Sequence, residues 1–116
     1  MVEIKKASRE LTKAEQYLLT IAPSIVSINK IPDGTKIPVE AYAVYDSVNE
    51  ETGETSEILS ILTKDKEVYA TCSKTFKHSF YDMVSIFGAD FTLEKITGTS
   101  KGGRTYVNCT LDVTSI

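Results

Sequence analysis

Tryptophan is absent from the 116-residue chain, and histidine, cysteine and proline are scarce, with one, two and three copies. One histidine and two cysteines are too few for the ligand set of a structural zinc site. No apolar run approaches the roughly 18 residues that a transmembrane helix requires. The sequence therefore predicts a protein without a metal, a cofactor or a membrane span.

The scarce residues also bear on catalysis. Cys72 and Cys109 lie in the apolar, strand-like segments VYATC and YVNCTL, so we expect both to be small buried residues rather than a disulfide or a reactive thiol. His78 lies in a lysine-rich helical segment and is expected at the surface. The sequence shows no Ser/His/Asp group, phosphate-binding loop or dinucleotide fingerprint. These features favour a binding protein and not an enzyme.

Length and composition indicate one ordinary globular domain. Apolar residues make up 41% of the chain and charged residues 25%, a common balance for soluble proteins. A single domain is expected over 1–116, with a helical extension at 1–24 and a barrel at 35–113. The first residues, MVEIKKASRELTK, lack the apolar core of a secretory signal. We therefore expect a cytoplasmic location, in the host cell if the protein is viral.

Two helices are predicted from apolar residues at helical spacing. The first covers 11–22 and is expected to bury Leu18 and Ile21. The second covers 73–88 and begins at Ser73, whose hydroxyl can accept an N–H of the first turn. Both helices are amphipathic, so each is expected to place one side on the rest of the domain.

Segments rich in valine and tyrosine, separated by polar turns, predict five strands. They cover residues 37–48, 57–63, 67–72, 91–97 and 104–113. The order of three strands, one helix and two strands is that of the five-stranded Greek-key OB barrel. We predict a mainly β protein with an OB barrel and an extra N-terminal helix. Another small α+β sheet, with the helix on one face, is the alternative.

Charge is distributed unevenly along the chain. The net charge is −3, and the segment NEETGETSE at 49–57 holds four glutamates. By contrast, seven of the 13 basic residues lie within 64–104. Local potential, more than net charge, decides which ligand is attracted, although on charge alone scattered surface lysines are the simpler interpretation.

The turn KGGR at 101–104 joins the last two predicted strands and carries two cations. An OB barrel binds oligonucleotides with its sheet face and with the loop after its fourth strand, the position of this turn. Binding of single strands requires cations for the phosphates and aromatic rings on which bases stack. The candidate interface residues are Tyr42, Tyr45, Lys64, Lys66, Tyr69, Lys74, Lys101, Arg104 and Tyr106.

Strand alternation ranks the tyrosines. Tyr69 and Tyr106 lie opposite the apolar side of their strands, which places them on the predicted ligand face. Tyr42 and Tyr45 have opposite parity and cannot both face one side unless a bulge intervenes. For these two residues, a stacking role and a position in the core are both open.

Three segments resemble the small single-stranded DNA-binding proteins of tailed phages that replicate linear genomes by protein priming. They are IPDGTKIPVEAYAVYDSV, EVYATCSKTF and KITGTSKGGRTYVNCTLDV. The shared features are a PDGT turn, an alanine-rich strand ending in tyrosine, a strand running into SKT, and a glycine hairpin before an aromatic strand. The resemblance covers roughly residues 28–113.

This resemblance implies a replication protein that coats the displaced strand without sequence preference and without catalysis. It also implies base stacking at Tyr45 and Tyr69, and phage replication proteins as partners. The N-terminal helix has no clear counterpart in the family, so the family's oligomeric state does not carry over. We expect the helix to pack on its own barrel in a monomer, with a dimer formed through the helix as the alternative. The chain ends LDVTSI, and recruitment through an acidic tail is not expected. An OB module that binds a protein partner is the alternative function.

Overall fold

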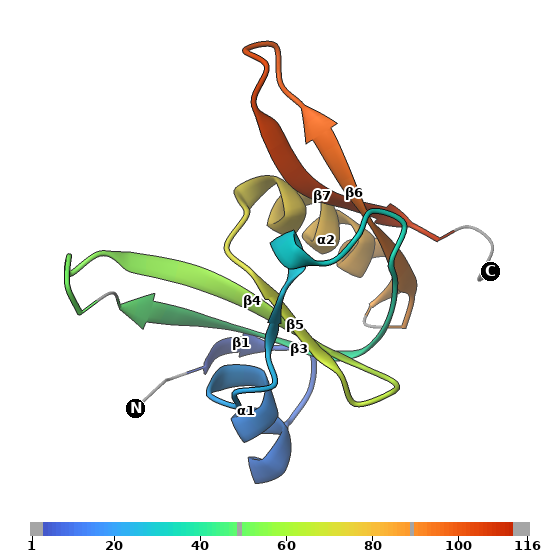
Figure 1. Ribbon diagram of the computed structural model, residues 1–116. Helices are drawn as coiled ribbons and strands as arrows, with labels where there is room; N and C mark the ends of the chain where they lie inside the picture. Colours follow the sequence, from blue (N-terminus) through green and yellow to red (C-terminus); the bar gives the residue numbers. More distant parts are fainter. Residues whose placement is uncertain (1–3, 49, 89, 113–116) are drawn as a thin grey trace.

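The computed structural model describes residues 4–48, 50–88 and 90–112 (Figure 1). Both predicted helices and all five predicted strands are present, with ends within two residues of the predicted ones. Two short strands near the N-terminus were not predicted, because they are too short to show alternation. The elements in order are β1 (Ile4–Ala7), α1 (Lys13–Thr20), β2 (Val26–Ser27), the 3-10 turn η1 (Ile28–Lys30), β3 (Lys36–Val48), β4 (Thr55–Thr63), β5 (Val68–Thr71), α2 (Lys74–Phe87), β6 (Thr92–Thr99) and β7 (Thr105–Leu111).

The strands form one strongly curled sheet (Figure 1). Six of them follow the order β2-β5-β4-β3-β6-β7, and β1 pairs with β3 outside this path. The long strand β3 pairs with β6 at its start, over 36–38, and with β1 further along, at 43–45. The fold is therefore a mixed α/β half-barrel with two helices.

The predicted OB topology is not confirmed, because the described strands include no pairing between β5 and β7. A side chain spans this opening instead. Ser73, between β5 and α2, donates a hydrogen bond from Oγ to the carbonyl oxygen of Val107 in β7, at 3.1 Å. The same Oγ accepts from the N–H of Phe76 at 3.2 Å, which confirms Ser73 as the cap of α2.

A register shift in β3 lets one strand contribute to two cores. The pairing of β3 with β4 is shifted between Val39 and Ala41. Because side chains alternate along a strand, an extra residue reverses the face of everything after it. Val39 and Tyr42 consequently lie in the same core although their numbers have opposite parity.

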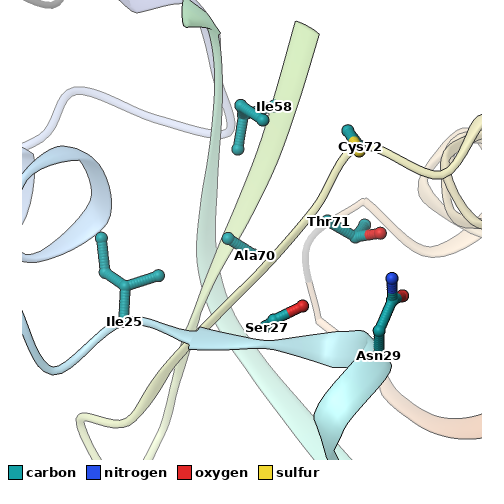
Figure 2. Close-up of a pocket in the computed structure, with 7 residues that line it drawn as sticks. All are labelled: Ile25, Ser27, Asn29, Ile58, Ala70, Thr71 and Cys72. Atoms are coloured by element: carbon teal, nitrogen blue, oxygen red, sulfur yellow. The ribbon is translucent and has the colours of Figure 1, made fainter. Parts of the chain in front are cut away.

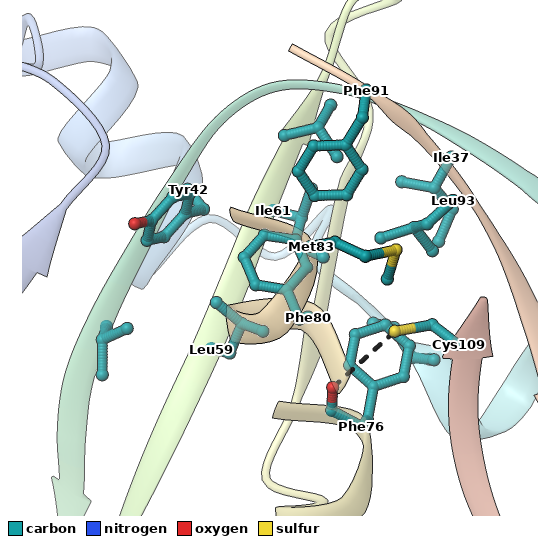
Figure 3. Close-up of a cluster of buried hydrophobic side chains, with 13 residues drawn as sticks. Ile37, Tyr42, Leu59, Ile61, Phe76, Phe80, Met83, Phe91, Leu93 and Cys109 are labelled. Atoms are coloured by element: carbon teal, nitrogen blue, oxygen red, sulfur yellow. Dashed lines mark hydrogen bonds between the residues drawn. The ribbon is translucent and has the colours of Figure 1, made fainter. Parts of the chain in front are cut away.

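Each face of the sheet carries one core. The larger lies under α2, where Tyr42 meets Phe80 edge-on with ring centroids 5.1 Å apart (Figure 3). The smaller lies under α1 and is built around Leu19. The larger core contains Ile28, Ile37, Val39, Tyr42, Val44, Leu59, Ile61, Phe76, Phe80, Met83, Phe91, Leu93 and Cys109, and the smaller contains Leu11, Leu19, Ala41, Ala43, Leu62 and Val68.

Two predictions of burial were wrong. Ile21 is 62% exposed, because α1 ends at Thr20 and the helical spacing does not continue; Leu19, at 0%, is the residue buried beneath the helix. Cys72 is exposed because β5 ends one residue before it, whereas Cys109 is buried as predicted. Among the described residues, neither helix has the length and apolar character of a membrane span.

Candidate nucleic-acid interface

The β6–β7 hairpin extends away from the sheet as an arm with two cations at its tip (Figure 1). The tip is closed by two backbone hydrogen bonds, from Ser100 N to the oxygen of Arg104 at 2.8 Å and from Gly103 N to the oxygen of Ser100 at 3.0 Å. Gly103 has a φ of +80°, a conformation that glycine adopts without strain. The turn thereby holds Lys101 and Arg104 in an exposed position.

One aromatic ring is fixed on this arm by a glycine. Tyr106 lies opposite Gly98 in the pairing of β6 with β7. A Cβ built on Gly98 would lie only 2.3 Å from Tyr106 Cζ, so the ring occupies the space of the missing side chain. Tyr106 nevertheless remains 37% exposed. The arm therefore presents a ring whose position depends on Gly98.

Two adjoining pockets lie beside the base of the arm. The first, of ≈ 430 Å³, is lined by η1, the start of α2 and the β6–β7 hairpin. The second, of ≈ 290 Å³, is lined by Ile25, η1, β4 and β5 (Figure 2). Asn29 and Cys72 line both pockets, so we call the pair the β5–β7 groove. Its residues are Ile25, Ser27, Asn29, Ile58, Ala70, Thr71, Cys72, Ser73, Lys95, Thr97, Thr105, Tyr106 and Val107.

One wall of this groove contains a buried lysine, Lys95, that forms an ion pair with Asp33. Lys95 is only 5% exposed, and its Nζ donates to Asp33 Oδ1 at 2.7 Å. The pKa of Asp33 is lowered below its usual value, mainly by the hydrogen bond from Lys95 and to a smaller extent by the one from Thr97. The charge of Lys95 is therefore compensated within the protein, and its role in the groove is structural.

The basic residues divide into paired and unpaired sets. Six of the 13 form ion pairs with carboxylates: Lys5, Arg9, Lys36, Lys64, Lys77 and Lys95. The other seven form no ion pair with any carboxylate that the structure describes: Lys6, Lys13, Lys30, Lys66, Lys74, Lys101 and Arg104. A cation without an internal partner keeps its charge for a ligand. Lys74, at the start of α2, follows directly after two residues of the groove.

The structure does not bring all the predicted cations together. Lys64 and Lys66 lie in the turn between β4 and β5, which Figure 1 places at the opposite end of the molecule from the tip of the arm. Lys64 also faces Asp90 at 3.6 Å. Neither residue is part of the β5–β7 groove.

Two of the predicted tyrosines lie inside the protein. Tyr42 is 3% exposed in the larger core, and Tyr45 is 6% exposed, with its hydroxyl 3.5 Å from the carbonyl oxygen of Thr20 in α1. Burial raises the pKa of both phenols. Neither ring is open to a base in this structure.

Tyr69 occupies an intermediate position. Its ring is half-buried against the larger core, and its hydroxyl donates to Glu67 Oε2 at 2.6 Å. This hydrogen bond, with burial and nearby carboxylates, raises the pKa of the phenol to about 12. The strand alternation was correct, but both faces of the sheet are covered here, so the side opposite Val68 is not a free surface.

The sequence did not reveal the other residues of the groove. Asn29 belongs to a 3-10 turn of three residues, too short for a periodic pattern. Cys72 was expected to be buried, but its thiol lies at the surface where the two pockets meet. Cys109 differs sharply, because burial raises the pKa of its thiol to about 12. The described residues contain no group of three side chains suited to hold a metal ion.

Comparison with known proteins identifies the family of the chain. The family model described as phage single-stranded DNA-binding protein matches residues 8–112. The chain belongs to this phage protein family. It is also similar to the single-stranded DNA-binding protein of Bacillus phage phi29, with 27% identity over 93 residues that cover 75% of each chain. No solved structure matches the chain.

The extent of the family match corrects one expectation. The resemblance noted in the sequence begins near residue 28, after the N-terminal helix, and we therefore expected the family to lack a counterpart of this helix. The match to the phage single-stranded DNA-binding proteins begins at residue 8 and so includes the whole of α1, at Lys13–Thr20. The helix therefore lies within the region that defines the family.

Proposed function

We propose that this protein binds single-stranded DNA along the β5–β7 groove and coats it during phage DNA replication, without sequence preference. The arrangement of the β6–β7 arm carries the proposal: an exposed ring, Tyr106, lines an open groove near three cations that pair with no carboxylate among the described residues. In this assignment Lys74, Lys101 and Arg104 contact phosphates. Tyr106 stacks on a base.

The chemistry of these residues supports binding without sequence readout. Stacking on an aromatic ring is tolerant of sequence, because every base has a π-face. Contacts between cations and phosphates position a strand but carry no information about its bases. We assign no catalytic residue, and the protein acts by covering the strand.

We further propose that the sheet is an OB-type barrel left open between β5 and β7. The strand order β5-β4-β3-β6-β7 and the helix between β5 and β6 support this assignment. The hydrogen bond from Ser73 to Val107 joins the two edges at one point. An opening here suits a ligand that must lie across the sheet edge.

The oligomeric state and partners follow from the same assignment. Helix α1 contributes Leu19 to its own sheet, so the apolar side that could have formed a dimer is largely used within the chain. We therefore expect a monomer that meets phage replication proteins on the DNA. The alternative is that the exposed face binds a protein partner, and salt separates the two, because only binding to DNA weakens steeply with ionic strength.

Cys72 allows a direct test of the groove. Under native conditions a maleimide should modify Cys72 and spare Cys109, which is buried with a raised thiol pKa. Saturating oligo(dT) should slow the modification of Cys72 by about tenfold or more, because the strand covers the thiol. Tyrosine fluorescence, free of tryptophan, measures binding in the same samples.

A matched control places the only exposed thiol elsewhere. In Cys72→Ser with Lys13→Cys, the thiol lies at the start of α1, on a residue that lines neither pocket of the groove, and its modification should be unaffected by oligo(dT). Tyrosine fluorescence unchanged by oligo(dT) at low salt would contradict the proposed function. If oligo(dT) quenches the fluorescence but Cys72 stays fully reactive, the protein binds DNA, and the assignment of the β5–β7 groove as the binding site is contradicted.

A further inference from the structure

A third pocket lies on the far side of the connection between β5 and α2. Its volume is ≈ 410 Å³, and its lining comes from α2 and from Glu57 in β4. Ser73 lines the β5–β7 groove and Lys74, the next residue, lines this pocket. A ligand leaving the groove over the start of α2 would therefore enter it directly. We call it the α2 pocket, lined by Glu57, Lys74, Lys77, His78 and Tyr81.

Helical geometry explains why these side chains gather. Lys74, Lys77, His78 and Tyr81 stand at positions i, i+3, i+4 and i+7 of α2, and so share one side of the helix. The core side of α2 is carried by other residues, with Phe80 among them. One helix therefore serves the core with one side and lines an open polar pocket with another.

A further cation, from β1, contacts one of the residues that line this pocket. The ammonium of Lys6 lies 5.5 Å from the centroid of the Tyr81 ring. This cation–π contact places an exposed lysine over the ring. Lys6 has no ion pair with a described carboxylate, so its charge is not compensated inside the protein. Sequence reasoning missed it, because β1 was not predicted.

The only carboxylate of the pocket is already neutralised by two other lysines. Glu57 Oε2 accepts from Lys5 at 3.1 Å, and Glu57 Oε1 lies 3.6 Å from Lys77 Nζ. Lys77 also donates to the backbone oxygen of Glu57 at 3.0 Å. The hydrogen bond from Lys5 keeps the pKa of Glu57 below its usual value, so the carboxylate stays ionised beside its partners. The charges left for a ligand are those of Lys6 and Lys74.

We propose that the α2 pocket is a second subsite for the same DNA strand, which takes the phosphodiester backbone on Lys6 and Lys74 after it crosses the start of α2. Tyr81 forms the wall against which the sugar of that segment lies. This inference rests on the proposed function, since it extends the track of one strand from the β5–β7 groove. It assigns the strand a longer footprint than the groove alone.

The test uses oligo(dT) of graded length, from about 4 to about 16 nucleotides, the range known for one such domain. Lys6→Gln removes the charge and keeps a long, polar, unbranched side chain that is one atom shorter. The matched control is Lys13→Gln, which removes an equally unpaired lysine from α1. Binding is measured by tyrosine fluorescence at several salt concentrations, and folding by thermal unfolding of each variant.

Lys6→Gln should bind the shortest oligonucleotides as the unmodified protein does, and lose affinity only above the length that spans both sites. For long oligonucleotides the loss between about 50 and about 200 mM salt should be smaller by about 2.6-fold, since one phosphate contact on single strands adds about 0.7 to the salt slope. Lys13→Gln should change neither quantity.

Three results would overturn the α2 pocket as a subsite. The first is Lys6→Gln matching Lys13→Gln at every length, and the second is an equal loss at all lengths. The third is a loss of affinity that follows a loss of folding stability, since Lys6 would then act by supporting Tyr81. Failure of the unmodified protein to bind any oligonucleotide would instead contradict the proposed function.

Discussion

Two antiparallel hairpins extend from the sheet in different directions, the β3–β4 arm and the β6–β7 arm (Figure 1). Their backbones are alike, and their outer ends are opposite in charge. The turn of the β3–β4 arm carries Glu50, Glu51 and Glu54. The tip of the β6–β7 arm carries Lys101 and Arg104. A net charge of −3 averages over these two ends and describes neither.

The arms also differ in how they are supported. The β3–β4 arm is flanked by β1, and Lys5 joins its two strands by reaching Asp46 at 3.2 Å and Glu57 at 3.1 Å. The outer half of the β6–β7 arm has no third strand among the described residues. It is stabilised there by the packing of Tyr106 on Gly98. In the proposed function, the supported acidic arm repels the DNA strand and the less supported basic arm folds over it.

The largest loss of affinity for oligo(dT) is expected when both arms carry negative charge. Lys101→Glu with Arg104→Glu gives the β6–β7 tip the sign of the β3–β4 turn, and should lower affinity for oligo(dT) on the order of 100-fold at low salt, because two attractive contacts become repulsive. Fluorescence titration measures the loss, and thermal unfolding should be unchanged because both side chains are exposed.

Neutralising the same two residues sharpens this result. Lys101→Ala with Arg104→Ala should weaken binding to all sequences alike and reduce the salt slope by about 1.4, the value for two phosphate contacts on single strands. An unchanged affinity together with an unchanged slope would show that the β6–β7 arm does not meet the DNA.

Removing the Tyr106 ring from the β6–β7 arm should cause the next largest loss of affinity for oligo(dT). Tyr106→Ala should cost on the order of 1–3 kcal/mol of binding to oligo(dT), whereas Tyr106→Phe should keep most of the affinity, because stacking uses the ring. Tyr17→Ala, on α1, is the control, since that ring is 49% exposed and is not among the residues that line the groove. Equal affinities for the Ala variants at 106 and 17 would remove Tyr106 from the site.

Gly98→Ala tests whether the position of that ring matters. Gly98 does not have a positive φ, so alanine causes no backbone strain there, but its Cβ would displace Tyr106. We expect affinity to fall toward that of Tyr106→Ala. Combining the two substitutions should add little to either one. Full additivity in this double-mutant cycle would mean that Gly98 acts independently of the ring.

Removing negative charge from the acidic arm should raise the affinity for oligo(dT) slightly, whereas the changes at the basic tip lower it. Glu50→Gln with Glu54→Gln changes as many charges as the neutralised basic tip, but at residues that line neither the β5–β7 groove nor the α2 pocket. Affinity should rise by about threefold or less at low salt and not at all at high salt, because screening removes the repulsion. A change as large as that at the basic tip would place the acidic arm beside the DNA.

The smallest effect is expected from a substitution of Glu57 in β4, and it concerns the folding stability of the protein and not its affinity for DNA. The pKa of Glu57 is lowered in the folded protein, chiefly by the hydrogen bond from Lys5. A group of this kind adds stability above its unfolded pKa, and the contribution is lost as the pH falls through the lower folded value. Glu57→Gln should therefore lower stability at pH 7 by about 1 kcal/mol or less. Thermal unfolding should show the difference shrinking below about pH 4.5, and a constant difference down to pH 2 would contradict it.

The sequence by itself determined both helices, five of the seven strands and the order of these elements. Apolar periodicity located both helices and five strands, Ser73 marked the start of α2, and the glycine turn marked the basic hairpin. These are local properties, decided by neighbouring residues, which is why they are visible in the chain. The family resemblance was carried by the same local segments, and the match over residues 8–112 confirms it.

The tertiary structure alone decided which side chains are exposed. The family resemblance implied base stacking at both Tyr45 and Tyr69, but α1 covers the first ring, and the second is partly buried against the larger core. Alternation along a strand shows only which residues share a face, and the packing of distant elements decides whether that face is open. The shift at Val39 to Ala41, the placement of Asn29 beside Cys72, and the position of Lys6 over Tyr81 all depend on contacts between segments far apart in the chain.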